Sequence, residues 1–290
     1  MSRNMHVYRR IFLPLSLICV LLFTCTPAIV AFAKAASSHS PSLVGPKAYY
    51  LALGDSLAFG YQPNVDWNHG YVDDFFTDLQ SHGATTVTNM GCPGETSNTF
   101  INGGCPGILL HKYLYFSSQL AAAVSYLRSH AGKVSPVTLD IGVNDLQPDV
   151  NTSTCTMNVR QFNADLKTLD TNLTNTILPQ LRAALTVKGK VTGDLLMMNY
   201  YDADQNTCPN TVSYMQKINQ HLTADVAGFG MMVDVFSAFG GAKVPNKNIC
   251  AYTWMCSIFT DVHAMRQGYS VIASALKKSY CLLYTSDAAD

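Results

Sequence analysis

The segment Gly54-Asp55-Ser56-Leu57 carries the first side chain that could act as a nucleophile. It follows directly on an apolar run at residues 49–53, which has the composition of a buried strand. A serine placed directly after such a strand lies where a parallel sheet opens its ligand crevice. The sequence therefore predicts a nucleophile at Ser56, which needs a base, an orienting acid and donors for an oxyanion.

The base and the orienting acid are predicted near the C-terminus, in Thr260-Asp261-Val262-His263. Residues two apart in an extended segment project to the same side, so Asp261 and His263 can be neighbours. The carboxylate can fix the imidazole tautomer while the other ring nitrogen takes the proton of Ser56. Because histidine ordinarily titrates at about pH 6.5, it can act as base and then as acid at neutral pH. Ser56, His263 and Asp261 are therefore the predicted catalytic residues.

Two further segments offer hydrogen-bond donors. Gly91 follows the second predicted strand and offers a backbone N–H that no side chain obstructs, and Asn144 follows the third and offers a side-chain amide. Such donors stabilise the oxyanion of acyl transfer. The alternative interpretation makes Gly54 and Gly142 simple turn residues, and makes Asn144-Asp145 and Asp261 helix caps. Four such segments at successive strand ends favour a shared site.

Strands and helices alternate along the chain. Strands are predicted at residues 49–54, 85–90, 137–142, 194–200 and 231–236, and helices at 71–82, 117–130, 159–185, 214–227 and 267–280. Five alternations are typical of an α/β fold with a parallel sheet covered on both faces. We find no internal repeat and no sign of a second domain.

Residues 1–33 have the pattern of a secretory signal peptide. Three arginines lie within the first ten residues, an apolar run follows at 11–23, and Ala31-Phe32-Ala33 matches a small-x-small cleavage site. A retained membrane anchor is the alternative, which Pro14 and Pro27 disfavour. The sequence therefore predicts a secreted, extracellular protein.

The remaining organisation is simple. Residues 34–46 are predicted to be a linker and residues 47–280 to form one α/β domain. Residues 281–290 are predicted to be a non-native tail, which resembles sequencing-adaptor read-through. The chain of 290 residues is 48% hydrophobic and formally neutral, and loss of the signal with its three arginines leaves a net charge of −3. Because no basic stripe is present, a nucleic-acid partner is not expected.

Cysteine usage agrees with export. Cys19 and Cys25 leave with the signal and Cys281 lies in the tail, so six cysteines remain for disulfides, and the sequence alone leaves their pairing open. No C-x-x-C pair and no H-E-x-x-H segment occurs, so neither a metal nor a cofactor is expected.

The four segments resemble the blocks of the GDSL family, also called SGNH hydrolases after their marker residues. Gly54-Asp55-Ser56-Leu57 matches the first block, Gly91 the second, Gly142-x-Asn144-Asp145 the third and Asp261-x-His263 the last. The resemblance implies a three-layer α/β/α, flavodoxin-like fold with a five-stranded parallel sheet. It also implies ester hydrolysis through an acyl-enzyme and an oxyanion hole made by the N–H groups of Ser56 and Gly91 with the Asn144 side chain.

With this fold in mind, the six cysteines suggest a pairing as a hypothesis. Three disulfides would stiffen the loops around the site, and the pairs would be Cys92–Cys105, Cys155–Cys208 and Cys250–Cys256.

Several residues are weaker candidates. His69 could line the substrate cleft or lie on a surface loop, Asp140 could form hydrogen bonds beneath the site, and residues 200–202 could form a cleft wall. Ala264 stands where many members of the family have proline, which suggests a less rigid loop after His263.

The predicted function is that of a secreted serine hydrolase of lipase or esterase type, monomeric, acting on a small-molecule, lipid or glycan ester. A carbohydrate acetyl esterase with the same fold is the alternative. A non-catalytic glycan- or lipid-binding module is a third possibility, but a binding module has no need to keep Ser56, Asp261 and His263 together.

Overall fold

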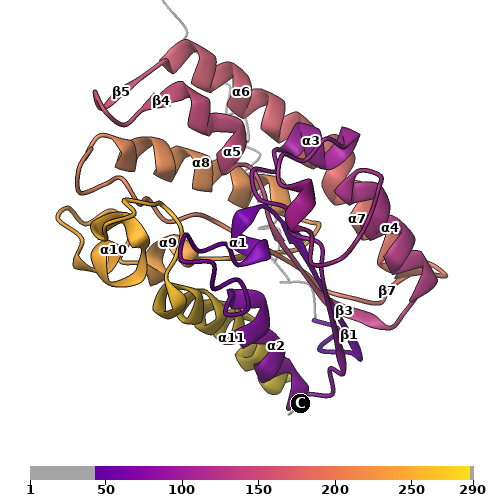
Figure 1. Cartoon of the computed structure of the whole chain (residues 1–290). Coiled ribbons are helices and arrows are strands. Elements are labelled where there is room, and N and C mark those ends of the chain that lie inside the picture. The colour runs from indigo at the N-terminus through magenta and orange to yellow at the C-terminus, as the bar shows by residue number, and fades with distance from the viewer. Residues whose placement is uncertain (1–42, 288–290) are drawn as a thin grey trace, which may run out of the picture. The chain divides into compact units, whose positions relative to one another are not determined.

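The computed structural model describes residues 43–287 (Figure 1). The predicted signal segment 1–33, most of the predicted linker and residues 288–290 lie outside the described residues. Within the described range, no helix combines the length and the apolar character needed to cross a membrane.

Five parallel strands form the central sheet in the order β2-β1-β3-β8-β9. They are β1 (Tyr49–Gly54), β2 (Thr86–Asn89), β3 (Val134–Asp140), β8 (Leu195–Met198) and β9 (Met231–Val233). Every residue of β3 and β8 is buried, as expected for strands covered on both faces. The order corresponds to the flavodoxin-like arrangement, so the predicted fold class is confirmed.

Helices cover both faces of the sheet. They are α1 (Ser56–Phe59), α2 (Tyr71–Gln80), α3 (Ser97–Asn102), α4 (Gln119–Ser129), α5 (Val143–Leu146), α6 (Val159–Asn172), α7 (Leu178–Ala184), α8 (Thr211–Val226), α9 (Val235–Ala238), α10 (Lys247–Tyr252) and α11 (Arg266–Asp287). Figure 1 shows α2 and α11 side by side on one side of the sheet, with α4 and α7 on the other.

Short elements complete the described part of the chain. They are the single turns η1 (Ile108–Leu110), η2 (Gln147–Asp149) and η4 (Trp254–Cys256), the π-helical turn η3 (Leu173–Ile177), and two hairpins, β4 (Val150–Asn151) with β5 (Thr156–Met157) and β6 (Thr186–Val187) with β7 (Lys190–Val191). Sequence periodicity missed both hairpins, because two-residue strands are too short to show a period.

Two predicted helices differ from the structure. The helix expected at 159–185 is present, but the π-helical turn η3 divides it into α6 and α7. The last helix, expected to end at residue 280, continues to Asp287. Residues 281–287 contain neither glycine nor proline, so nothing in their backbone ends the helix. Whether this tail is native stays a prediction.

The end of β1 is placed very close to β3. Gly54 has φ +138°, and a Cβ atom there would lie 2.2 Å from the backbone oxygen of Asp140. The N–H of Asp55 donates to the same oxygen at 3.1 Å, and the chain then turns at once into α1. Glycine at position 54 therefore lets Ser56 emerge at the carboxyl edge of the sheet, directly after β1.

The three disulfides of the hypothesis are all present. Cys92 is bonded to Cys105, Cys155 to Cys208 and Cys250 to Cys256. The first disulfide joins the loop after β2 to the segment that follows α3. The second joins the β4–β5 hairpin to the loop before α8, and the third joins α10 to η4. Each disulfide therefore ties down a segment near the carboxyl edge of the sheet.

Candidate active site

Ser56 is the first residue of α1 and lies at the edge of a cavity. Asp55 caps this helix, since its Oδ1 atom accepts the N–H of Leu57 at 2.9 Å. Gly60 ends the helix after one turn with φ +82°. Because Ser56 occupies the first helical position, its N–H has no partner within the helix. The residue is 9% exposed, which leaves Oγ accessible from the cavity alone.

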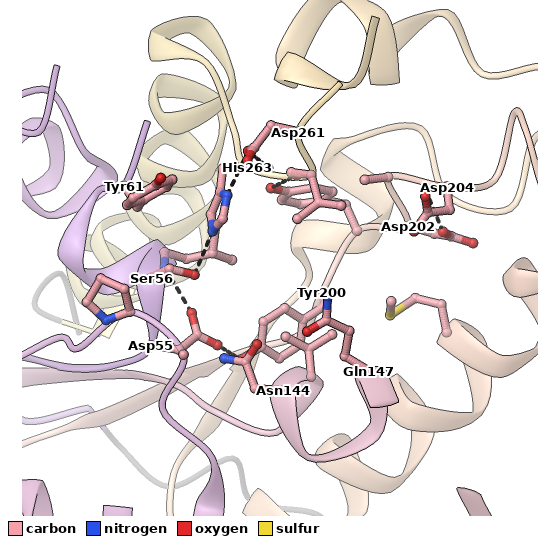
Figure 2. Close-up of a pocket in the computed structure, with 18 residues that line it drawn as sticks. Asp55, Ser56, Tyr61, Asn144, Gln147, Tyr200, Asp202, Asp204, Asp261 and His263 are labelled. Atoms are coloured by element: carbon pink, nitrogen blue, oxygen red, sulfur yellow. Dashed lines mark hydrogen bonds and ion pairs between the residues drawn. The ribbon is translucent and has the colours of Figure 1, made fainter. Parts of the chain in front are cut away.

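His263 connects Ser56 with Asp261. Its Nε2 atom lies 2.8 Å from Ser56 Oγ, and its Nδ1 atom lies 2.7 Å from Asp261 Oδ1. Figure 2 shows the three side chains in line along one wall of the cavity. Asp261 Oδ1 also accepts the backbone N–H of His263 at 2.9 Å. The sequence-predicted serine, histidine and aspartate are thus brought together in the order that proton transfer requires.

The charge of Asp261 is favoured by the same contacts. Partial burial acts to raise the pKa of its carboxyl group, but the side-chain and backbone hydrogen bonds from His263 outweigh it and hold that pKa below its ordinary value. An ionised Asp261 fixes the tautomer of His263 in which Nδ1 carries the proton. Nε2 is then the basic nitrogen that faces Ser56.

The loop that carries His263 is held on both sides. The carbonyl of His263 accepts the N–H of Trp254 at 3.0 Å, and the N–H of Met265 donates to Tyr252 at 2.8 Å. Ala264 is fully buried and forms an isolated bridge with Thr253. The backbone pairing of residues 252–254 therefore holds this loop without a proline at position 264.

Gly91 does not reach the cavity, contrary to expectation. Its N–H donates to Asn89 Oδ1 at 2.9 Å, so the hydrogen is already used in a local turn. A Cβ atom at this position would lie 2.4 Å from the backbone nitrogen of Phe59, which makes glycine necessary for packing against α1. The structure therefore corrects the prediction that Gly91 supplies an oxyanion donor.

Gly94 lines the cavity instead. Pro93 and Gly94 form a tight turn, which the N–H of Glu95 closes by donating to Cys92 at 3.1 Å. Gly94 has φ +82°, a value that favours glycine. Within the described part of the chain, its N–H takes part in no hydrogen bond. The Pro-Gly pair was the sequence signal that could have identified this turn.

Asn144 lies beside this turn, at the start of α5. Its Nδ2 atom donates to the carbonyl oxygen of Glu95 at 2.9 Å, which uses one of its two amide hydrogens. The second hydrogen remains for a ligand in the cavity, which Asn144 lines. Ser56, Gly94 and Asn144 all line this one cavity.

Two fully buried carboxyl groups lie beneath Ser56. Asp55 Oδ2 accepts the hydroxyl of Tyr200 at 2.8 Å, while Asp140 accepts the hydroxyl of Tyr71 at 2.6 Å and the N–H of Ala58 at 3.0 Å. Burial raises the pKa of Asp140 well above its ordinary value, and the nearby charge of Asp55 raises it further. Burial and the neighbouring Asp55 charge thus favour a protonated Asp140, although the hydrogen bonds from Tyr71 and Ala58 act to lower its pKa. Asp140 forms hydrogen bonds under the site, as predicted.

A second buried network joins Glu95 to β1. Gln119 accepts the N–H of Gly54 at 2.6 Å, donates to the carbonyl of Gly54 at 2.9 Å and donates to Glu95 Oε2 at 3.0 Å. Burial raises the pKa of Glu95 to about 7. Because the carbonyl of Glu95 also holds Asn144, this network connects the donor loop with the strand that carries Ser56. Sequence reasoning missed both Glu95 and Gln119.

The cavity has a volume of about 370 Å³. Residues 200–202 form part of its wall, as predicted, and the ring of Tyr61 lies 4.6 Å from the ring of His263. His69 takes no part in the lining; its Nδ1 atom lies 2.6 Å from Asp66 on the loop before α2. The predicted catalytic residues thus line the cavity together with both polar and apolar side chains.

Among the described residues, one cluster has the composition of a metal site, namely Cys92, Cys105 and His111. The two sulfur atoms are joined in a disulfide, and a disulfide does not offer the thiolates that bind zinc. This cluster therefore does not fit a metal ion.

A model of the GDSL-like Lipase/Acylhydrolase family matches residues 52–270, a range that contains Ser56, Gly94, Asn144, Asp261 and His263. A comparison with curated proteins finds no match.

Solved structures with the same fold include two enzymes of low sequence identity. The acetylxylan esterase Axe2 from Geobacillus stearothermophilus is 16% identical with a TM-score of 0.54, over 82% of this chain and 95% of that chain. The lipase Lip_vut3 from a goat rumen metagenome is 17% identical with a TM-score of 0.57, over 81% of this chain and 98% of that chain. At such identities the likeness supports the fold alone.

Proposed function

The chain belongs to the GDSL-like lipase/acylhydrolase family, and we propose that it cleaves esters through an acyl-enzyme formed on Ser56. Membership of this family makes the chain a carboxylic ester hydrolase. The observation that carries the proposed mechanism is the pair of short contacts from His263, 2.8 Å to Ser56 and 2.7 Å to Asp261.

In the first step, Ser56 Oγ attacks the carbonyl carbon of the ester while its proton passes to His263 Nε2. The imidazolium that results is stabilised by the Asp261 carboxylate on the other ring nitrogen. His263 then gives the proton to the departing alkoxide, so the alcohol leaves and the acyl group stays bonded to Ser56. Asp261 remains ionised throughout, in keeping with its lowered pKa.

The negative charge that develops on the carbonyl oxygen needs donors already in place. We assign this role to the N–H groups of Ser56 and Gly94 and to the side-chain amide of Asn144. The support for Asn144 is that the Glu95 carbonyl fixes its orientation through one amide hydrogen. Such donors cost no reorganisation when the charge appears.

Hydrolysis of the acyl-enzyme completes the cycle. His263 takes a proton from a water molecule, the hydroxide oxygen bonds to the acyl carbon, and the proton returns to Ser56 Oγ as the ester bond to serine breaks. The products are a carboxylic acid and the free enzyme. None of these steps draws on a metal or a cofactor.

We also propose that the protein is secreted as a monomer with its three disulfides formed. The support is the sequence pattern of residues 1–33 together with the disulfides, which persist in oxidising compartments outside the cytosol. Within ester hydrolysis, we favour the lipase or esterase type over a carbohydrate acetyl esterase.

Labelling with a fluorophosphonate probe tests the mechanism. The mature protein should label at one serine, Ser56→Ala should abolish labelling and turnover of p-nitrophenyl esters, and Ser274→Ala, an exposed serine of α11, should change neither. If folded protein hydrolyses esters but labels at a serine other than Ser56, the proposed nucleophile is wrong. Folded protein that neither labels nor turns over ester would instead favour a binding module.

A further inference from the structure

A second cavity of about 490 Å³ opens from the catalytic cavity. The two cavities share six lining residues, namely Val143, Gln147, Val262, Met215, Asp202 and Asp204. In Figure 2, Gln147, Asp202 and Asp204 lie on the side of Ser56 opposite to Tyr61. The second cavity, which we call the side cavity, therefore extends away from Ser56 beyond Asn144.

More than half of the residues that line the side cavity are apolar. Leu146 of α5, Phe162 of α6 and Ile218 of α8 line it, and they are 1%, 1% and 4% exposed. Met215 and Met255 add unbranched thioether side chains, which adapt to ligands of different shape. The volume lies within the range of about 300–1,000 Å³ that is typical of small-molecule sites.

One of the two acidic groups at the entrance, that of Asp202, is already hydrogen-bonded. Asp202 accepts the N–H of Asp204 at 3.0 Å through one carboxyl oxygen and the hydroxyl of Thr211 at 2.7 Å through the other. Lysine, arginine and histidine are absent from the described residues that line the side cavity. A negatively charged ligand would therefore find no cationic partner there.

We propose that the side cavity binds the acyl chain of the substrate, so that the enzyme prefers esters of apolar acids with several methylene groups. This inference rests on the proposed function, because it places the acyl carbonyl between Ser56 and Asn144. Val143 directly precedes Asn144 and lines both cavities, so a chain attached to that carbonyl can continue along Val143 into the side cavity. An acetyl group ends at one methyl and would leave the side cavity unfilled.

The acyl half of the ester is the better occupant for a chemical reason. The acyl group stays covalently attached to Ser56 through the intermediate, whereas the alcohol departs after the first step. A chain held in the side cavity keeps the acyl carbonyl in place for attack by water. The alcohol can leave through the rest of the catalytic cavity, near Tyr61.

The test compares kcat/KM for p-nitrophenyl esters from acetate to octanoate. Burial of each added methylene should raise kcat/KM by about threefold until the side cavity is filled. Met215→Trp, which adds bulk where the two cavities meet, should lower the ratio of octanoate to acetate turnover at least tenfold. Met215→Ala should keep or raise that ratio. Gln216→Trp places the same indole on the exposed face of α8 and should leave the profile as in the wild type.

Fluorophosphonate titration of Ser56 in every preparation separates the two proposals. Loss of labelling in the wild-type protein would count against the proposed function itself. Labelled protein whose kcat/KM is flat or falls with acyl length overturns the side-cavity proposal alone. The side-cavity proposal is also wrong if chain length matters only in alkyl acetates, because the side cavity would then bind the alcohol. It is wrong as well if acetylated xylan oligomers are cleaved faster than octanoate esters.

Discussion

The buried carboxyl group of Glu95 should make stability depend on pH in a way that one substitution removes. Glu95 is fully buried, its Oε2 atom accepts from Gln119, and its Oε1 atom has no partner among the described residues. Glu95→Gln keeps the shape and stays neutral at every pH. The amide group would still accept from Gln119, so the variant should differ from the wild type mainly in having no proton to lose.

The direction of the effect follows from the two pKa values of Glu95. In the unfolded chain the group titrates at about 4.5, and in the folded protein burial raises its pKa to about 7. Below the lower value both states hold the proton. As pH rises, the unfolded state gives up its proton first, so stability falls until about pH 7. At roughly 1.4 kcal/mol per pKa unit, this gap corresponds to about 3 kcal/mol. The Glu95→Gln variant has no proton to lose at this position, so its free energy of unfolding should not show this fall.

Urea unfolding at pH 5, 6, 7 and 8, with the disulfides intact, measures the effect. The free energy of unfolding of Glu95→Gln relative to the wild type should become more favourable by about 2–3 kcal/mol between pH 5 and pH 8. Asp234→Asn is the control. Despite partial burial, hydrogen bonds from Ser237 and Asn199 lower the pKa of Asp234, so it is ionised in both states across this range. A Glu95→Gln difference that stays constant with pH would refute the reasoning.

The other predictions concern the reaction and the disulfides. Asn144→Ala should lower kcat by roughly 10²–10³ while the circular dichroism spectrum stays unchanged, because one oxyanion donor is lost; near-normal turnover would remove Asn144 from that role. Asp261→Asn should lower kcat by on the order of 10⁴ in stopped assays with a p-nitrophenyl ester, because His263 then favours the wrong tautomer. Replacing Cys155 and Cys208 by serine should lower the free energy of unfolding by about 2–4 kcal/mol in urea titrations.

The catalytic residues could be predicted because their geometry is local. Ser56 follows its strand directly, and Asp261 and His263 are two residues apart, so no long-range packing has to be known before they can be related. Strand ends of a parallel sheet meet at one edge, which brings Ser56 together with Asn144. Asp261 and His263 follow no strand directly, and the loop between η4 and α11 carries them to Ser56. The short contacts of His263 agree with this reasoning.

The choice between Gly91 and Gly94 could not be made in the same way. Both glycines lie in one loop after β2, and either could have offered its N–H. The outcome depends on Asn89, whose side chain takes the N–H of Gly91, and on the turn at Pro93, which brings Gly94 to the cavity. Orientation of a backbone N–H within a loop is set by such contacts and not by residue type.

The sequence indicated one of the two buried acids and missed the other. Asp140 lies in a predicted buried strand, whereas Glu95 lies in a loop and nothing in its neighbours distinguishes it from an exposed acid. Their burial is produced by packing against distant partners, namely Tyr71 for Asp140 and Gln119 for Glu95. A single sequence does not contain the distance between these pairs.

The raised pKa values of these acids also suit the reaction. A negative charge close to the oxyanion would oppose it, and the opposition is strong where water is excluded. Burial favours the neutral form of Asp140 beneath Ser56 and raises the pKa of Glu95, whose carbonyl holds Asn144, to about 7. Both groups can therefore take part in the hydrogen bonds that hold the nucleophile and the oxyanion donors in place. Below pH 7 they do so without adding charge beside the oxyanion. Asp261 differs from both, since its charge is needed next to His263 and its pKa is held low.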